Sequence, residues 1–243
     1  MSRKEDESLD DLILGGMRVY QPLDGYRFSI DAVLLAFFAE IKPQEKIVDL
    51  GTGCGVIPLI LAWREPNITI TGIDIIDSVT ERAERNVQLN GLSPRIRIIQ
   101  GDVKNIEHFQ PKHSAQVVLS NPPFWKKGEG KVSIHKEQAL ARHEIEMQLM
   151  DVVSAAAYLL SSGGRFYIVQ RSERLAELLL LLAEANLYPS KLRTIHSFWD
   201  QSAKMVLVEA VKNTKAKLSI SSPLIIYMAP NVYTPEIQAM YGR

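Results

Sequence analysis

The tetrapeptide Asn121-Pro122-Pro123-Phe124 contains the residues whose types and spacing most clearly predict chemistry. It follows the apolar run Gln116-Val117-Val118-Leu119-Ser120, which is typical of a buried strand. Because the two prolines fix φ and donate no backbone hydrogen, we expect a stiff loop with free carbonyls. The Asn121 side-chain oxygen and the Pro122 carbonyl can each accept one N–H of a planar amine, and Phe124 offers a flat apolar face. The tetrapeptide therefore predicts a site for an exocyclic amine or an amide nitrogen.

A second segment whose residue types and spacing predict chemistry is glycine-rich. It runs Asp49-Leu50-Gly51-Thr52-Gly53-Cys54-Gly55, at the expected junction of a strand and a helix. Three glycines permit positive φ and let backbone amides approach a ligand: Gly51, Gly53 and Gly55. Asp74 ends the next expected strand, 23 residues after Gly51, where a carboxylate accepts hydrogen bonds from ribose hydroxyls. Asp102 ends the strand after that. Acids at successive strand ends predict a nucleoside cleft at the carboxyl edge of a parallel sheet.

The glycine-rich segment lacks the features of a phosphate-binding loop. A dinucleotide fingerprint has the spacing GxGxxG and presents a helix N-terminus to a pyrophosphate. This segment has the spacing GxGxG, contains no basic residue and begins with Asp49. An acid at this place suits a ligand that carries a positive ammonium and a sulfonium group. We therefore predict S-adenosylmethionine as the cofactor.

Composition limits the other classes of function. A chain of 243 residues with 46% hydrophobic residues can bury a full core. Its formal net charge is zero, no apolar run is long enough for a membrane helix, and the acidic start Lys4-Glu5-Asp6-Glu7 differs from a secretory signal. The single cysteine, Cys54, excludes an internal disulfide and a zinc site of several thiolates. We therefore expect a cytoplasmic protein without a membrane segment and without a metal.

Local charge is less even than the net charge. Basic residues follow the tetrapeptide directly, and a second basic stretch runs from Lys191 to Lys217. Charge runs of this kind often form no more than a solvated surface. Beside a candidate active site they also suit phosphate contact, so we predict substrate binding by Lys126, Lys127 and Arg142. Trp125 is either a second stacking surface for a base or a lid residue.

Strands and helices alternate along the chain, which predicts right-handed βαβ crossovers and a parallel sheet. The runs that indicate strands lie at 46–50, 68–73, 96–99, 116–120, 165–170, 190–196 and 205–211. Helical spacing covers 57–64, 78–90, 144–160 and 173–185. The last two strands predict an antiparallel pair at the sheet edge. We expect an N-terminal extension over residues 1–40 that packs on the cofactor site, and one domain over residues 41–243.

The segment from Val48 to Gly55 resembles motif I of the Rossmann-like class I methyltransferases. Together with Asn-Pro-Pro-Phe, it is similar to enzymes that methylate exocyclic or amide nitrogens. Three further segments resemble the family of tRNA1(Val) adenine-N6 methyltransferases, which act on the adenosine 3′ of the anticodon: Gly25 to Ala36, Ala141-Arg142-His143-Glu144 and Tyr233-Thr234-Pro235-Glu236. The resemblance implies an α/β fold with a seven-stranded, mostly parallel sheet, one antiparallel edge hairpin strand and helices on both faces.

The resemblance also implies roles at the cofactor. The three glycines would line its methionine end, Asp74 its ribose, and Asp102 its adenine amino group. Asp49 and the segment from Tyr26 to Asp31 would help to hold the amino-acid moiety.

At the substrate, the resemblance implies that Asn121 and Pro122 bind the target N6 of an adenosine in tRNA, with Phe124 stacking on the base. The family more often carries Tyr than Phe at the position of Phe124. The phenylalanine keeps the stacking on the base but lacks the hydroxyl contact of the tyrosine. Two alternatives stay open from the sequence. One is methylation of guanine N2 in RNA or of a protein glutamine amide, and the other is a non-catalytic module that binds RNA or S-adenosylmethionine.

Overall fold

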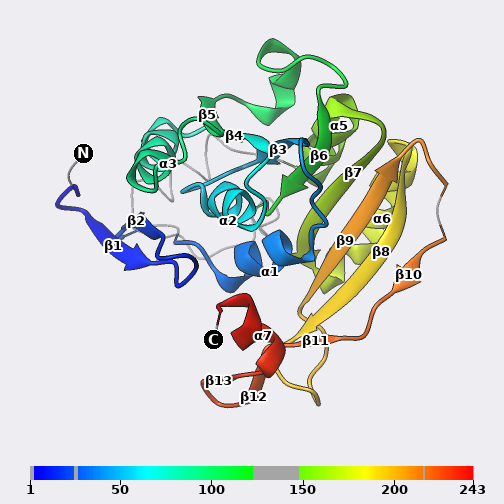
Figure 1. Cartoon of the computed structure of the whole chain (residues 1–243). Helices are drawn as coiled ribbons and strands as arrows, with labels where there is room; N and C mark the ends of the chain where they lie inside the picture. The colour runs from blue at the N-terminus through cyan, green and yellow to red at the C-terminus, as the bar shows by residue number, and fades with distance from the viewer. Residues whose placement is uncertain (1–2, 25–26, 123–147, 216, 243) are drawn as a thin grey trace.

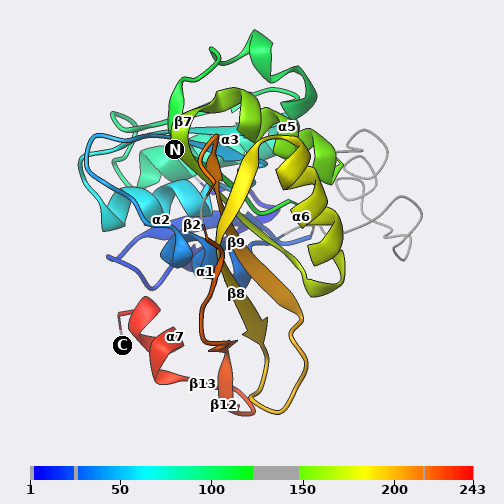
Figure 2. The ribbon, with the colours of Figure 1, turned by 90° about the vertical axis from the view of Figure 1, so that its right-hand side faces the viewer.

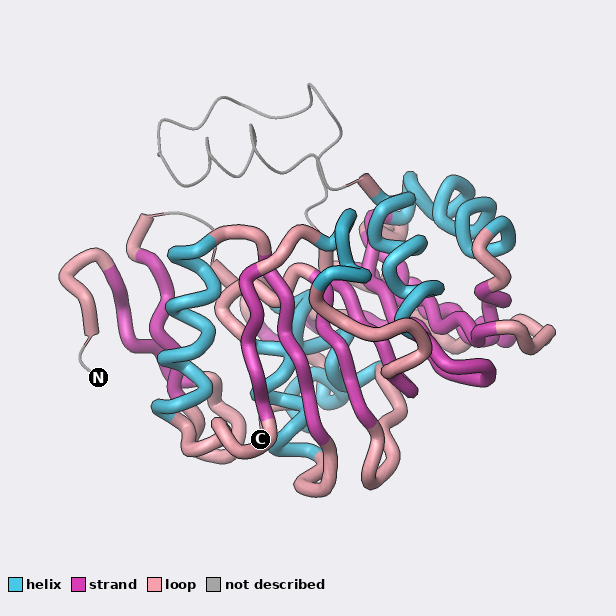
Figure 3. The backbone as a smooth tube through the Cα atoms, turned by 90° about the horizontal axis from the view of Figure 1, so that it is seen from above, coloured by secondary structure: helices cyan, strands magenta, loops and turns pink. Residues whose placement is uncertain are grey.

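The computed structural model describes residues 3–24, 27–122, 148–215 and 217–242 (Figure 1). Its centre is a nine-stranded sheet with the spatial order β10-β8-β9-β7-β6-β3-β4-β5, and β11 also pairs with β8. Figure 3 shows strands of this sheet side by side along their length. The strands are β3 (Lys46–Leu50), β4 (Thr69–Asp74), β5 (Ile96–Gln100), β6 (Ala115–Ser120), β7 (Leu160–Arg171), β8 (Leu187–His196), β9 (Met205–Lys212), β10 (Ser219–Ile220) and β11 (Leu224–Ile225).

The sheet is mostly parallel, as the sequence predicts. Strands β5, β4, β3, β6 and β7 pair in parallel, and β9 lies antiparallel between β7 and β8. The α/β class and the antiparallel pairing of the last two predicted strands, β8 and β9, are therefore confirmed, but the strand number is not. The predicted seven strands become nine, because residues 219–225 return along the outer side of β8 as β10 and β11. These short strands pair with backbone groups of β8 that would otherwise form an exposed edge.

Helices cover both faces of the sheet (Figure 2). On one face lie α1 (Ile30–Phe38), α2 (Val56–Arg64) and α3 (Asp77–Leu89), and on the other lie α5 (Leu149–Leu159) and α6 (Leu175–Glu184). Two 3-10 helices, η1 (Val103–His108) and η2 (Ser172–Arg174), precede β6 and α6. Each face has its own cluster of buried apolar side chains. Helix α2 is buried along most of its length, since it packs between the sheet and its helical neighbours.

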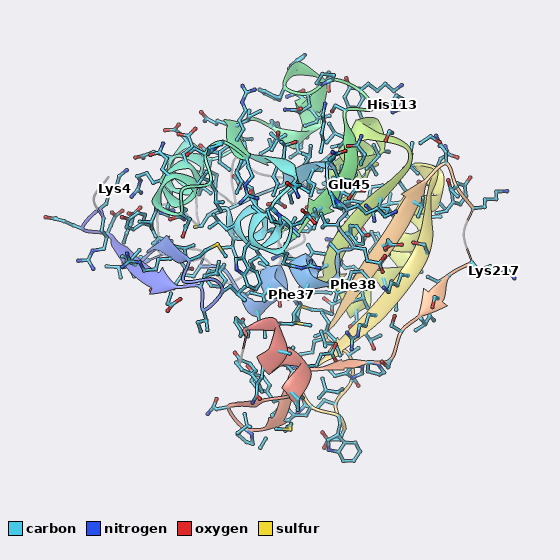
Figure 4. The ribbon with its side chains drawn as sticks, viewed as in Figure 1. Lys4, Phe37, Phe38, Glu45, His113 and Lys217 are labelled. Carbon is cyan, nitrogen blue, oxygen red and sulfur yellow. The ribbon has the colours of Figure 1, made fainter. Side chains whose placement is uncertain are left out.

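The termini add elements that the sequence analysis did not predict. An N-terminal hairpin consists of β1 (Glu7–Asp11) and β2 (Arg18–Pro22) and packs on α3. At the C-terminus, β12 (Tyr227–Ala229), β13 (Val232–Tyr233) and α7 (Pro235–Met240) form a small unit beside α1 (Figure 1). Figure 4 labels Phe37 and Phe38, the last two residues of α1. The division of the chain at residue 40 stays a prediction.

Much of the second basic stretch is used inside the fold. Lys191 forms an ion pair with Glu40 at 2.9 Å, and Arg193 binds Glu236 of α7 through two hydrogen bonds of 2.6 and 2.8 Å. Both cations therefore tie β8 to segments outside the sheet, the loop after α1 and the helix α7.

The N-terminal hairpin is held to α3 by one buried acid. The Glu7 side chain is fully buried, and it accepts hydrogen bonds from Arg82 at 2.9 Å and from Arg85 at 2.8 Å. Burial alone would raise the pKa of Glu7, but the bonds from Arg85 and Arg82 outweigh it and lower the pKa to about 2. Nearby, the Asn86 side chain accepts a hydrogen bond from the Tyr20 amide and donates one to the Tyr20 carbonyl.

We expect Glu7→Gln to lower the free energy of unfolding at pH 7 by about 3 kcal/mol, because it leaves two buried guanidinium groups without their anion. The depressed pKa means that Glu7 stabilises the fold above the unfolded pKa and loses this effect as pH falls through about 2. The difference between wild type and variant should therefore shrink from pH 5 toward pH 2 in chemical denaturation. The control Glu177→Gln removes a half-exposed partner of Arg174, away from the Glu7 cluster, and should change little. A pH-independent difference would contradict this account.

Candidate active site

The parallel pairing of β3, β4, β5 and β6 brings the predicted site residues to one edge of the sheet. Leu50, the last residue of β3, is in register with Ile73 of β4 and with Ser120 of β6. Asp74, at the end of β4, is in register with Gln100 of β5. The residues that follow these strands therefore lie near one another at one edge of the sheet. They include the glycine-rich segment, Asp102 and Asn121.

The glycine-rich segment turns sharply over the end of β4. Its three glycines have positive φ, with 72° at Gly51, 57° at Gly53 and 81° at Gly55. The amides of Gly51 and Thr52 donate hydrogen bonds of 2.8 and 3.0 Å to the Ile73 carbonyl. A Cβ atom on Gly53 would meet nothing within 4 Å, so open space lies beside its backbone. The segment thus presents bare backbone to open space.

Gly72 of β4 makes room for this segment, and the sequence analysis did not single it out. A Cβ atom on Gly72 would lie 2.7 Å from the Thr52 hydroxyl and 2.9 Å from a methyl of Ile98. Any larger residue would push the glycine-rich segment away from the sheet. A glycine inside a run of β-branched residues is the signal that could have identified it.

Asp74 binds the backbone of the glycine-rich segment. Its Oδ2 accepts a hydrogen bond of 3.0 Å from the Gly53 amide, and its Oδ1 accepts one of 3.2 Å from the Ile76 amide. Burial raises the pKa of Asp74, and the backbone donors act in the opposite direction. Since a carboxylate has about four acceptor positions, these two bonds leave capacity for ligand hydroxyls.

Asp102 lies two residues after Gln100, the last residue of β5, so it does not end the strand as predicted, and it caps η1. Its Oδ1 accepts a hydrogen bond of 2.9 Å from the Lys104 amide, which fixes the half-buried side chain at the strand end. Next to it, a Cβ atom on Gly101 would lie 3.0 Å from the ring of Phe109. The carboxylate therefore stands at the rim of the edge, beside an aromatic ring.

Asp49 is the most unusual acid of the site. It is 0% exposed, and neither of its carboxylate oxygens has a hydrogen-bond partner among the described residues. Burial raises the pKa of Asp49 to about 7; the nearby Thr52 side chain lowers it in part, and the charge of Asp74 raises it further. An orphaned buried carboxylate costs free energy, so a cation at this place would be stabilising.

Asn121 meets the glycine-rich segment around a single cavity. Ser120, the residue before it, donates a hydrogen bond of 2.8 Å to the Leu50 carbonyl and so ties the end of β6 to the end of β3. The Asn121 Oδ1 atom is buried and has no partner among the described residues. The cavity holds about 40 Å³ and is lined by Phe28, Ala32, Gly51, Thr52, Gly53, Cys54, Val56, Ile57 and Asn121. This size suits one end of a cofactor, whose remainder would lie across the open strand ends.

The start of α1 closes the cavity from the N-terminal side. Asp31 is buried, and its Oδ2 accepts a hydrogen bond of 2.8 Å from the Ser29 hydroxyl. Burial raises the pKa of Asp31, and the Ser29 bond lowers it in part. The lining residue Phe28 lies in the predicted segment from Tyr26 to Asp31, whereas Ala32 and Thr52 were not predicted as site residues. Ala32 lies in the segment that carries the family resemblance, which is the signal that could have found it.

Several predicted site residues lie outside the described residues: Tyr26, Phe124, Trp125, Lys126, Lys127 and Arg142. Pro122 is described and buried, directly after Asn121. Within the described ranges, no group of three or more His, Cys, Asp or Glu side chains could hold a metal ion. No helix in the same ranges has the length and apolar character needed to cross a membrane.

Comparisons with known proteins agree with this arrangement. Residues 29–185 match the family model described as methyltransferase small domain. A tRNA1(Val) (adenine(37)-N6)-methyltransferase of Porphyromonas gingivalis is 32% identical over 221 residues, which cover 86% of this chain and 85% of the relative.

Solved structures share the fold. A predicted O-methyltransferase from Agrobacterium tumefaciens superposes with a TM-score of 0.72 at 23% identity, over 87% of this chain and 95% of that chain. A geranyl diphosphate methyltransferase solved in complex with S-adenosylmethionine has a TM-score of 0.54 at 16% identity, over 74% and 84% of the two chains. The family model and the sequence relative agree: the chain belongs to the methyltransferase small domain family and, within it, to the tRNA1(Val) (adenine(37)-N6)-methyltransferases.

Proposed function

We propose that this protein transfers a methyl group from S-adenosylmethionine to the exocyclic N6 of an adenosine in tRNA, the adenosine at position 37, directly 3′ of the anticodon. One observation carries this conclusion most directly. Asn121, whose buried amide oxygen has no partner among the described residues, lines the same cavity as the backbone of the glycine-rich segment. An acceptor for an N–H thus stands beside a place for a methyl donor.

The residues present suit S-adenosylmethionine. Asp49 and Asp31 are buried acids near the glycine-rich segment and would attract the ammonium of the amino-acid end. Asp74 would accept hydrogen bonds from the ribose, and Asp102 one from the adenine amino group. When bound, S-adenosylmethionine supplies an electrophilic methyl group on a sulfonium. The open space beside Gly53 lets a ligand approach the backbone there.

Asn121 and Pro122 would activate the acceptor nitrogen. The N6 lone pair of adenine is delocalised into the ring, so the free amine is a poor nucleophile. When both N–H groups donate to the Asn121 Oδ1 and the Pro122 carbonyl, the nitrogen can pyramidalise and aim its lone pair at the methyl group. The same two oxygens stabilise the positive charge that develops on nitrogen, and a proton then leaves to water. The proposed chemistry rests on positioning and electrostatics.

The relatives named tRNA1(Val) (adenine(37)-N6)-methyltransferase favour tRNA over the alternatives of guanine N2 and a glutamine amide. An unpaired base of the anticodon loop is already partly unstacked, so moving it into the cavity costs little. We propose that the protein acts on tRNA in the cytoplasm, with Lys126, Lys127 and Arg142 on the phosphate backbone and Phe124 and Trp125 on the base.

The function is tested by incubating the protein with S-adenosylmethionine and total tRNA that lacks the modification, followed by nucleoside mass spectrometry. We expect N6-methyladenosine, and fragment mapping should place it 3′ of one anticodon. The appearance of N2-methylguanosine, or of label in protein only, would overturn the proposal, and so would the absence of any methyl transfer.

Asn121→Ala should slow methyl transfer about 10²- to 10³-fold, which corresponds to about 2–4 kcal/mol in the barrier, because one acceptor of the reacting nitrogen is lost. Single-turnover kinetics at saturating cofactor measures this step. The control Asn67→Ala changes an exposed turn residue and should keep the wild-type rate. Near wild-type turnover of Asn121→Ala would show that this side chain does not hold the acceptor.

Asp49 should make cofactor binding depend on pH. Its pKa is raised to about 7, so the carboxylate becomes increasingly ionised as pH rises through 7. Because the ionised form attracts the ligand ammonium, the affinity for S-adenosylhomocysteine should rise about five- to tenfold from pH 6 to pH 7.5 in calorimetric titrations. Asp49→Asn should bind more weakly and lose this dependence, whereas the exposed control Asp77→Asn should keep it. A wild-type affinity that does not change over this range would contradict the role.

A further inference from the structure

A second cavity lies between the two ends of the chain. It holds about 460 Å³, which is within the usual range for small-ligand sites. The loop between β1 and β2 forms one side and the C-terminal unit forms the other; both views of the ribbon place these segments next to each other (Figures 1 and 2). We call this cavity the terminal groove. Its lining includes Asp11, Ile13, Phe28, Asn231, Tyr233 and Tyr241.

A row of packed aromatic rings ends at the terminal groove. Tyr241 stacks on Tyr233 with ring centroids 6.0 Å apart, and Tyr233 stacks on Tyr227 at 5.2 Å. Phe198, from the loop after β8, lies 5.7 Å from Tyr227. Tyr233 has a ring on each side, whereas Tyr241 is the last ring of the row among the described aromatic pairs. A flat ligand in the groove can therefore continue the row by stacking on Tyr241.

The polar groups of the terminal groove match a base better than a phosphate. None of the described residues that line it is a lysine or an arginine, and Asp11 brings a negative charge. A phosphate would be repelled there, since phosphate sites are built from cations and free amides. Asn231 and Gln238 carry side-chain amides, which can both donate to and accept from the edge of a base. The groove thus combines aromatic faces with neutral hydrogen-bonding groups.

Backbone strain marks the rim of the terminal groove. Ile13 has a φ of 63°, a conformation that β-branched residues rarely adopt, and its side chain is 43% exposed. The loop is held in this form by a hydrogen bond of 2.6 Å from the Ile13 amide to Asp11 and by contact of Gly15 with Trp63. An apolar side chain held outward at the mouth of a cavity offers a surface to a ligand.

The terminal groove adjoins the candidate active site, because Phe28 lines both cavities. We propose that the groove binds the base of an unpaired nucleotide that neighbours the target adenosine in the RNA, stacked on Tyr241 and contacted at its edge by Asn231. This inference rests on the proposed function, and it adds a binding site for the flanking sequence. It assigns to the C-terminal unit a part in substrate selection.

The test is a set of RNA-binding measurements by fluorescence anisotropy with a labelled anticodon stem–loop. Tyr241→Ala should weaken binding about tenfold, through the loss of one stacking contact, and Tyr241→Phe should restore it to within about twofold. Asn231→Gly should weaken binding about threefold while keeping a residue that tolerates its φ of 61°. The control Met228→Ala, on the same hairpin and half-exposed, should bind as the wild type does. Affinity for S-adenosylhomocysteine should be unchanged in all four variants.

A double-mutant cycle then identifies the ligand. Stem–loops with an abasic site 5′ or 3′ of the target adenosine lack one neighbouring base each. If the groove holds that base, one of the two abasic RNAs should bind wild type about tenfold more weakly, and Tyr241→Ala should add little to that loss. Additive losses with both abasic RNAs would overturn the proposal. Unchanged RNA binding by both Tyr241→Ala and Asn231→Gly would also overturn it, and would leave the groove to a peptide or another ligand.

The failures of the two proposals are distinguishable. A wild-type protein that methylates the intact stem–loop, together with groove variants that bind it equally well, contradicts only the groove. A wild-type protein that neither binds nor methylates RNA contradicts both.

Discussion

The parallel pairing of β3, β4, β5 and β6 is the constraint on which the site depends. The carboxyl ends of parallel strands lie at the same edge of the sheet, so the residues that follow these strands can line one cleft. The register of Leu50 with Ile73 and Ser120 places the glycine-rich segment between the acids and Asn121. Gly72 permits this segment to lie close over β4. A shift of one residue in any of these strands would turn its terminal side chain to the other face.

The site keeps polar groups that the fold itself leaves unsatisfied. Asp49 is fully buried without a hydrogen-bond partner among the described residues, and so is the amide oxygen of Asn121. Each such group costs about 1–3 kcal/mol when no ligand is present. The two continuous apolar clusters on the faces of the sheet offset this cost, and the buried Glu7 cluster fixes the hairpin that borders the site. Ligands that satisfy these groups therefore gain affinity from a preorganised cleft.

The strands that carry the chemistry could be predicted from the sequence, and the parts that surround them could not. The runs at 46–50 and 116–120 match β3 and β6 to within one residue, because buried parallel strands are continuous β-branched runs. The hairpin β1–β2, helix α1 and the C-terminal unit depend on contacts between distant segments, such as Glu7 with Arg82 and Arg193 with Glu236. For the same reason, Ala32 was recognised as a site residue only when the fold brought α1 beside the glycine-rich segment.

The central claim is that one edge of the sheet holds the methyl donor with its reactive end at Asn121. A crystal structure of the protein with S-adenosylhomocysteine tests this most directly. The account predicts that the ligand lies across the strand ends, with its ribose at Asp74, its adenine at Asp102 and its sulfur toward the Asn121 side chain. A ligand bound elsewhere, or bound with its sulfur turned away from Asn121, would contradict the account.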